Sequence, residues 1–234
     1  MLTLYYAPHT CSLASHIALE DAGAAYALKR VDFKIAEQQS PAYLEVNPKG
    51  RVPAMVTPRG ILTETPAMLG FIAQSFPAAK LAPLDDAFAF ARVQAFNNYL
   101  CATLHVAHAH RMRGHRWVDD PAAILAMQKK VPESVSACFA LIERQMLVGP
   151  WVMGEAYTIA DPYLFTLAQW LEADGVDRAD PAGDGPSCAN GGARQRQEGN
   201  CRGTGRVIDR SSARPLAAVV VSRRTAPSTG RPRP

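Results

Sequence analysis

The chain has 234 residues and a net charge of +4, which suits one large domain or two small ones. No stretch approaches the roughly 20 uninterrupted apolar residues of a membrane-spanning helix, and the N-terminus lacks the basic stretch and apolar run of a secretory signal. Five Cys residues without regular spacing argue against a disulfide framework or a metal site. We therefore expect a cytoplasmic protein that acts without a membrane.

The charge and the aromatic residues divide the chain near residue 177. Residues 178–234 hold 11 Arg, no Lys and 4 acidic residues, a net charge of +7, and none of the aromatic residues. Only residues 1–177 can therefore build a substantial core. We expect 178–234 to be disordered and to contribute no site residue. We interpret its odd composition as a shifted reading frame rather than as an arm that binds nucleic acid.

The first 80 residues alternate between predicted strands and helices. Their turns are marked by Pro and Gly, and the apolar spacing changes between strand and helix periods. The predicted elements are a strand at 2–6, a helix at 12–20, a strand at 26–33, a helix from 40 to 44, a strand ending at 56, a strand at 61–62 and a helix from 65 to about 76. The order is βαβαββα, which indicates an α/β domain over residues 1–80.

Residues 86–177 have an entirely helical pattern. One long helix is predicted at 87–113, and a second at 121–147 with a break or kink at Pro132. Thr158 and Asp161 have the spacing of a capping box, which precedes a helix that is apolar nearly all round. We expect a second, all-α domain that packs around this last helix.

Four sequence strings carry a resemblance to a known family. They are LYYAPHTCSLASHIAL, NPKGRVPAM, ILTETPAM and YTIADPYLFTLAQW, and they lie within residues 1–177. Their order and spacing resemble the glutathione transferases, most closely the bacterial beta class. The resemblance implies a thioredoxin-like N-terminal domain, an all-α C-terminal domain that is truncated at its C-terminal end in this chain, and a homodimer. It also implies an enzyme that uses glutathione as co-substrate without another cofactor, and a small hydrophobic electrophile as second substrate.

Cys11 lies at the start of the first predicted helix, where the helix dipole and the free amides should lower the pKa of its thiol. The resemblance implies that Cys11 meets the glutathione sulfur and forms a mixed disulfide with it. Tyr6 and Ser12 flank this position and are alternative hydrogen-bond donors to the thiolate. Structural roles remain open for both: Tyr6 as a packed strand residue, and Ser12 as a helix-start residue.

Two segments are expected to hold the glutathione backbone. Val52 and Pro53 resemble the cis-proline turn of thioredoxin-like folds, which leaves the backbone groups of residue 52 free to pair with an extended peptide. Glu64 and Thr65 precede a helix, so that the helix N-terminus suits the γ-glutamyl carboxylate and the acidic side chain suits its ammonium group.

Three further residues complete the predicted site. Asn98 and His105 lie seven residues apart on the long helix and therefore share a face. The resemblance places both at the glutathione site, with His105 in a catalytic role, although a cluster of His residues can also mark a solvated face. Lys34 is a candidate partner of the glycine carboxylate.

Three functions are compatible with these residues. The leading one is a glutathione transferase that presents the glutathione thiolate to an electrophile. The second is a glutathione-dependent thiol oxidoreductase that uses Cys11. The third is a non-enzymatic relative that binds glutathione or another ligand. Replacement of Cys11 by Ser discriminates between the first two.

Overall fold

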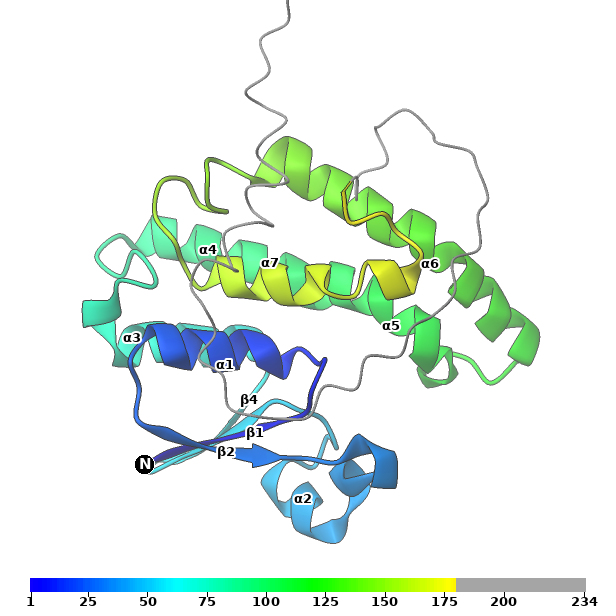
Figure 1. The fold of residues 1–234 in the computed structure, drawn as a ribbon, viewed down its shortest axis with the longest axis horizontal. Coiled ribbons are helices and arrows are strands. Elements are labelled where there is room, and N and C mark those ends of the chain that lie inside the picture. The colour runs from blue at the N-terminus through cyan, green and yellow to red at the C-terminus, as the bar shows by residue number, and fades with distance from the viewer. Residues whose placement is uncertain (180–234) are drawn as a thin grey trace, which may run out of the picture.

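The computed structural model describes residues 1–179 (Figure 1). The expectation of a disordered segment at 178–234 therefore lies almost entirely outside the described residues. Within them, the predicted order βαβαββα is confirmed, and it is followed only by helices.

The N-terminal domain is built on one mixed sheet of four strands in the order β2-β1-β3-β4. β1 runs parallel to β2 and antiparallel to β3, and β3 forms a hairpin with β4. The elements are β1 (Leu2–Tyr6), α1 (Ser12–Asp21), β2 (Tyr26–Arg30), α2 (Pro41–Val46), β3 (Ala54–Thr57), β4 (Gly60–Thr63) and α3 (Thr65–Ser75). This is the thioredoxin-like arrangement that the sequence predicts.

Helices α1 and α3 cover one face of the sheet, and α2 lies away from them on the other side (Figure 1). Leu4 and Met55 from the sheet, Leu19 from α1, and Met68 and Ile72 from α3 are fully buried in one apolar cluster. Because α1 and α3 bury apolar side chains on both sides, they also provide the surface against which the helical domain packs.

β2 ends three residues earlier than predicted. Phe33 lies in a short 3-10 turn, Phe33–Ile35, and not in the strand. The cause is local: the side chain of Asp32 accepts a hydrogen bond from the backbone N–H of Lys34 at 2.8 Å and so caps the turn.

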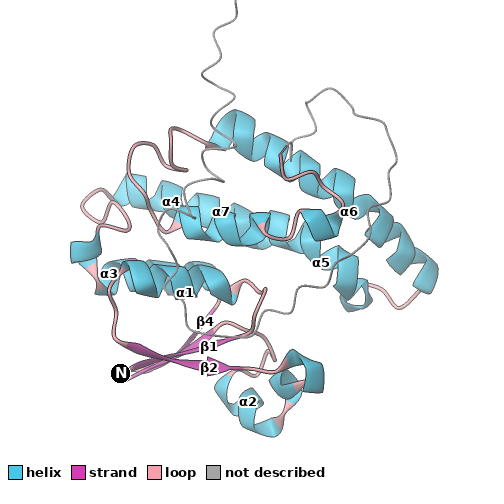
Figure 2. Cartoon of the chain, viewed as in Figure 1, coloured by secondary structure: helices cyan, strands magenta, loops and turns pink. Residues whose placement is uncertain are grey.

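The helical domain forms a layer above α1 and α3 (Figures 1 and 2). It comprises α4 (Ala87–Tyr99), α5 (His105–Arg113), α6 (Pro121–Leu141) and α7 (Ala160–Ala168). The predicted helix at 87–113 is continuous, but a π-helical segment, Leu100–Leu104, joins α4 to α5. Of the break or kink predicted at Pro132, the break is wrong because α6 runs through this residue, and the kink stays a prediction.

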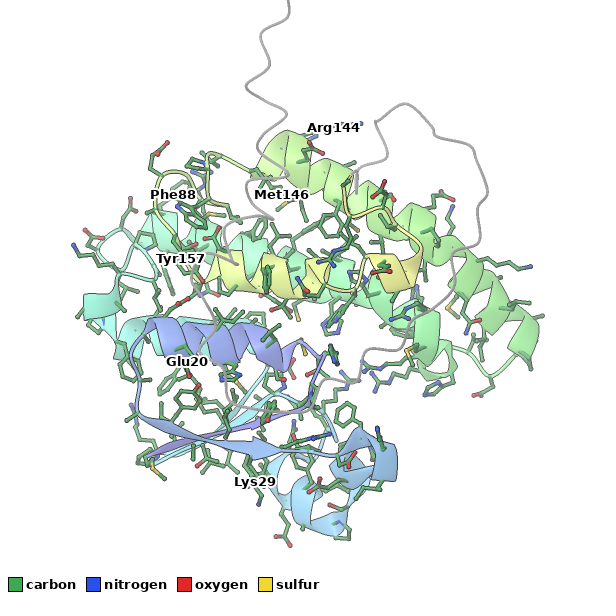
Figure 3. The ribbon with its side chains drawn as sticks, viewed as in Figure 1. Glu20, Lys29, Phe88, Arg144, Met146 and Tyr157 are labelled. Carbon is green, nitrogen blue, oxygen red and sulfur yellow. The ribbon has the colours of Figure 1, made fainter. Side chains whose placement is uncertain are left out.

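α7 is buried along most of its length, as its composition predicts. Asp161 accepts hydrogen bonds from the backbone N–H of Thr158 at 2.7 Å and of Val152 at 2.9 Å. The Thr158 hydroxyl accepts from the N–H of Ala160, and not from that of Asp161 as the capping box predicts. Tyr157, just before this cap, donates to Asp21 of α1 at 2.7 Å and ties the two domains together (Figure 3).

None of the helices within residues 1–179 is long and apolar enough to cross a membrane.

Candidate functional site

The turn between β1 and α1 is held by its own side chains. The Thr10 hydroxyl donates to the carbonyl of Ala7 at 2.8 Å and contacts the Ser12 hydroxyl at 2.7 Å. Ser12 is buried, and its hydroxyl accepts from the Ala7 N–H at 3.3 Å. The Ser12 hydroxyl therefore fixes the turn, in agreement with the structural role left open above. The turn fixed in this way places Cys11 directly before the first residue of α1.

Cys11 is half-buried and faces the segment that carries Pro53. Its thiol donates to the carbonyl oxygen of Val52, with an Sγ–O distance of 3.5 Å. Desolvation raises the pKa of the Cys11 thiol to about 11, although a hydrogen bond with the Thr65 side chain and the charge of Arg113 act in the opposite direction. The predicted lowering of this pKa is therefore wrong: burial outweighs the helix N-terminus, and Cys11 is a neutral thiol at pH 7.

The peptide bond between Val52 and Pro53 is cis, as predicted. The preceding carbonyl, that of Arg51, accepts hydrogen bonds from the Tyr43 hydroxyl at 2.7 Å and the Asn47 side chain at 2.6 Å. These contacts anchor the loop, and within residues 1–179 the Val52 N–H has no hydrogen-bond partner. The loop thus presents one free donor, and one acceptor that Cys11 occupies.

Glu64 and Thr65 lie where β4 passes into α3. Glu64 has φ +71° and ψ +121°, a conformation that costs a non-glycine residue about 1–3 kcal/mol and that clusters at ligand sites. Its carboxylate is paired with Lys49 at 2.5 Å, and Lys49 also donates to the Thr63 hydroxyl. Thr65 is buried at the first position of α3, where helix amides are unpaired. Lys49 was not predicted, because its partner lies 15 residues further along the chain.

His105 is the first residue of α5, and its ring lies 5.1 Å from the ring of Trp170. The Trp170 indole in turn donates to the carbonyl of His9 at 3.1 Å, in the turn before Cys11. Burial, together with the positive charge of Arg113 and its neighbours, lowers the pKa of His105 to about 4. His105 is therefore a neutral imidazole at pH 7, positioned by Trp170, which the sequence did not single out.

Three other predicted site residues make no contact with the residues described above among the interactions of residues 1–179. Lys34 and Asn98 have exposed side chains. The Tyr6 ring lies 6.1 Å from the ring of His16, and its hydroxyl makes no hydrogen bond within the described part of the chain. Their proposed roles toward glutathione stay predictions.

The geometry defines a class of protein: a thioredoxin-like domain with a cis-proline loop, a helix-start Cys and a strained Glu, whose turn before that Cys is linked through Trp170 to a His of an all-helical domain. Comparisons with known proteins agree. Residues 1–74 match the family described as "Glutathione S-transferase, N-terminal domain". The chain is 33% identical to the glutathione S-transferase GstA of Escherichia coli O157:H7 over 74% of this chain and 83% of that protein.

Solved structures give the same result. A glutathione transferase homolog from Sulfitobacter, solved with bound glutathione, is 39% identical with a TM-score of 0.75, and the match covers 97% of this chain and 94% of that one. A bacterial beta class glutathione S-transferase from Sphingomonas chungbukensis is 33% identical with a TM-score of 0.63, covering 77% and 88% of the two chains. The chain belongs to the glutathione S-transferase family.

Proposed function

We propose that this protein binds glutathione at the cluster around Cys11 and joins it, through its sulfur, to small electrophiles. The observation that carries the proposal is the meeting of three segments that are distant in sequence. The Cys11 thiol lies against the Val52 carbonyl and interacts with the Thr65 side chain. Relatives with this fold are named glutathione transferases, and some were solved with glutathione bound.

Each part of glutathione finds a complementary group. The free N–H and the carbonyl of Val52 can pair with the cysteinyl backbone, as an added strand would. The unpaired amides at the start of α3 suit the γ-glutamyl carboxylate. The Glu64 carboxylate suits the neighbouring ammonium group, and it would exchange Lys49 for this partner. Binding of the cysteinyl backbone would also release the Cys11 thiol from the Val52 carbonyl.

The released Cys11 thiol is then a donor beside the glutathione sulfur. Because the pKa of Cys11 is about 11, it keeps its proton at pH 7 and donates a hydrogen bond to the thiolate of glutathione. A hydrogen bond to a charged group contributes about 1.5–3 kcal/mol and favours the thiolate form, so that the glutathione thiol gives its proton to the solvent. The thiolate then attacks the electrophilic carbon. A sulfur–carbon bond forms, and the electron pair leaves with the departing group or enters a conjugated system.

The raised pKa of Cys11 also disfavours a thiol oxidoreductase as the main function. Disulfide exchange requires the thiolate of the attacking Cys, and burial, which raises the pKa of Cys11 to about 11, disfavours that form. The relatives named above are transferases. We therefore assign Cys11 the role of hydrogen-bond donor and not that of nucleophile.

We also infer a homodimer. Phe88, at the start of α4 (Figure 3), is 77% exposed, and Leu84, in the segment before α4, is 37% exposed. Exposed apolar side chains such as these are favourably buried against a second subunit. Light scattering coupled to gel filtration should give twice the mass of 25.3 kDa, and a monomer across micromolar concentrations would contradict this inference.

The proposed function is tested with Cys11→Ser and Cys11→Ala. Glutathione conjugation of 1-chloro-2,4-dinitrobenzene is measured by kcat/KM. We expect Cys11→Ser to retain most of the activity, because its hydroxyl also donates, and Cys11→Ala to lose about tenfold or more. Loss of all turnover in Cys11→Ser would favour the oxidoreductase. Tight glutathione binding by the wild type without turnover of any electrophile would select the non-enzymatic relative.

A further inference from the structure

One ion pair joins the loop before Val52 to the start of α3 at the proposed glutathione site. The Lys49 ammonium lies 2.5 Å from a carboxylate oxygen of Glu64 and also donates to the Thr63 hydroxyl at 2.7 Å. Within residues 1–179, Glu64 forms an ion pair with no other cation. The carboxylate that suits the ammonium group of glutathione therefore already holds an ammonium group of the protein.

The backbone around Lys49 is fixed independently of this ion pair. The Lys49 N–H donates to the side-chain oxygen of Asn47 at 3.2 Å, and the Gly50 N–H donates to the Asn47 carbonyl at 2.9 Å. Asn47 is itself buried, and its side-chain amide donates to the Arg51 carbonyl. The loop therefore keeps its shape when the Lys49 side chain moves or is removed.

The ion pair also contributes little to the stability of the fold. The side chains of Lys49 and Glu64 are 42% and 54% exposed, and solvent screens ion pairs between such side chains. Glu64 has the strained φ of +71°, and backbone strain of this kind clusters at functional sites. The effect of the pair should therefore fall on ligand binding rather than on folding.

We propose that Lys49 is a specificity-determining residue, because it occupies the position of the ligand's ammonium group on Glu64. The inference rests on the proposed function and refines it. The ammonium group of glutathione has to displace Lys49 from Glu64, so that Lys49 weakens the binding of glutathione. A thiol ligand without an ammonium group leaves the ion pair intact, and Lys49 then balances the charge of Glu64 beside the carboxylate of that ligand.

Lys49 thereby reduces the difference in affinity between the two kinds of ligand. Displacement by glutathione replaces one ammonium group on Glu64 by another, so the carboxylate stays paired. The Thr63 hydroxyl gives the displaced Lys49 ammonium a second acceptor. The site would accept γ-glutamyl thiols and, less tightly, analogues of these thiols in which the amino group is absent.

Isothermal titration calorimetry with two ligands tests the inference. They are glutathione and glutaryl-cysteinylglycine, which lacks only the amino group. In Lys49→Met, glutathione should bind about threefold more tightly and the analogue about threefold more weakly, as expected for an exposed ion pair, so that the ratio of the two affinities rises about tenfold. The control Lys130→Met removes an exposed lysine that pairs with Glu133 on α6, and it should leave the ratio unchanged.

A double-mutant cycle connects the effect to Glu64. In Glu64→Gln the carboxylate for which the two ammonium groups compete is absent. The further change Lys49→Met should therefore leave the affinity for glutathione as it is in Glu64→Gln alone. A threefold gain that persists in the Glu64→Gln background would reveal a general effect of charge and would overturn the inference.

The remaining outcomes separate the inference from the proposed function. If glutathione binds to the wild type but more weakly to Lys49→Met, Lys49 contacts the ligand directly, and the inference is wrong while the transferase stands. An unchanged ratio of the two affinities in Lys49→Met would overturn it as well. If the wild type binds neither ligand, the proposed function fails and the inference fails with it.

Discussion

The two domains satisfy their polar groups in different ways. In the sheet domain, most side-chain hydrogen bonds join residues close in sequence, as between Ser12 and Ala7 or between Asn47 and Arg51. Local hydrogen bonds also prevail in the helical domain, as at Thr158, but a buried pair there, His108 with Asp174, joins residues that are 66 apart in sequence. The buried side-chain amide of Asn97 in this domain also lacks a hydrogen-bond partner within residues 1–179.

The binding surface of the sheet domain is fixed by local turns. The buried polar groups of the helical domain depend on tertiary contacts. The sheet domain can present backbone groups of the glutathione site because local turns fix them. The helical domain positions His105 and Trp170 only when α5 and the segment after α7 have packed together. Breaking a long-range contact should therefore cost more than breaking a local one.

The largest effect should follow from removal of His108. Its ring pairs with the buried carboxylate of Asp174, which also contacts Arg111. His108→Ala leaves this carboxylate without one partner and creates a cavity, so we expect a loss of about 3 kcal/mol or more in the free energy of unfolding. Urea denaturation measures it. His110→Ala, half-buried on the same helix beside Trp117, is the matched control, with an expected loss of about 1 kcal/mol. Equal losses in the two variants would refute the assigned importance of the buried pair.

A second effect concerns acid stability. The pKa of His105 falls from 6.5 to about 4 on folding, chiefly through burial, so the folded protein prefers the neutral ring. This contribution is fully present above pH 6.5 and is lost as the pH falls toward 4, with a total of about 3 kcal/mol. We expect the difference in unfolding free energy between wild type and His105→Gln to shrink by that amount between pH 7 and pH 4. A difference that stays constant over this range would show that His105 titrates normally.

The smallest effect should come from a local contact. The Thr158 hydroxyl caps the start of α7 by accepting from the N–H of Ala160. Thr158→Ala should lose about 1 kcal/mol of stability, and Thr158→Ser should restore most of it. Thermal unfolding of the three proteins measures this. A loss in Thr158→Ala that matches His108→Ala would remove the distinction between local and long-range contacts.

The sheet domain was predictable from sequence for the same physical reason. Its turns, its cis proline and the start of α3 depend on short motifs, and these interactions form between neighbours. The end of β2 was missed by three residues, because the hydrogen bond from Lys34 to the side chain of Asp32 competes with strand pairing.

The details of the helical domain and the electrostatics of the site were harder to predict from the sequence. The π-helical segment Leu100–Leu104 changes the register by one residue, which an apolar repeat does not reveal. The contact between Trp170 and His9 joins residues 161 apart, and no sequence pattern signals it. The pKa of Cys11 was predicted in the wrong direction because its burial depends on how the two domains pack, whereas the helix N-terminus is visible in the sequence.

The central claim is that the sheet domain binds glutathione through Val52, Glu64 and Thr65. Isothermal titration calorimetry of glutathione with Glu64→Ala tests it most directly, with Glu45→Ala, an exposed residue of α2, as control. Glu64→Ala should weaken binding by about 1.5–3 kcal/mol, the range of a hydrogen bond to a charged group, while Glu45→Ala should bind like the wild type. Glutathione affinity that is the same in Glu64→Ala and in the wild type would contradict the site assignment.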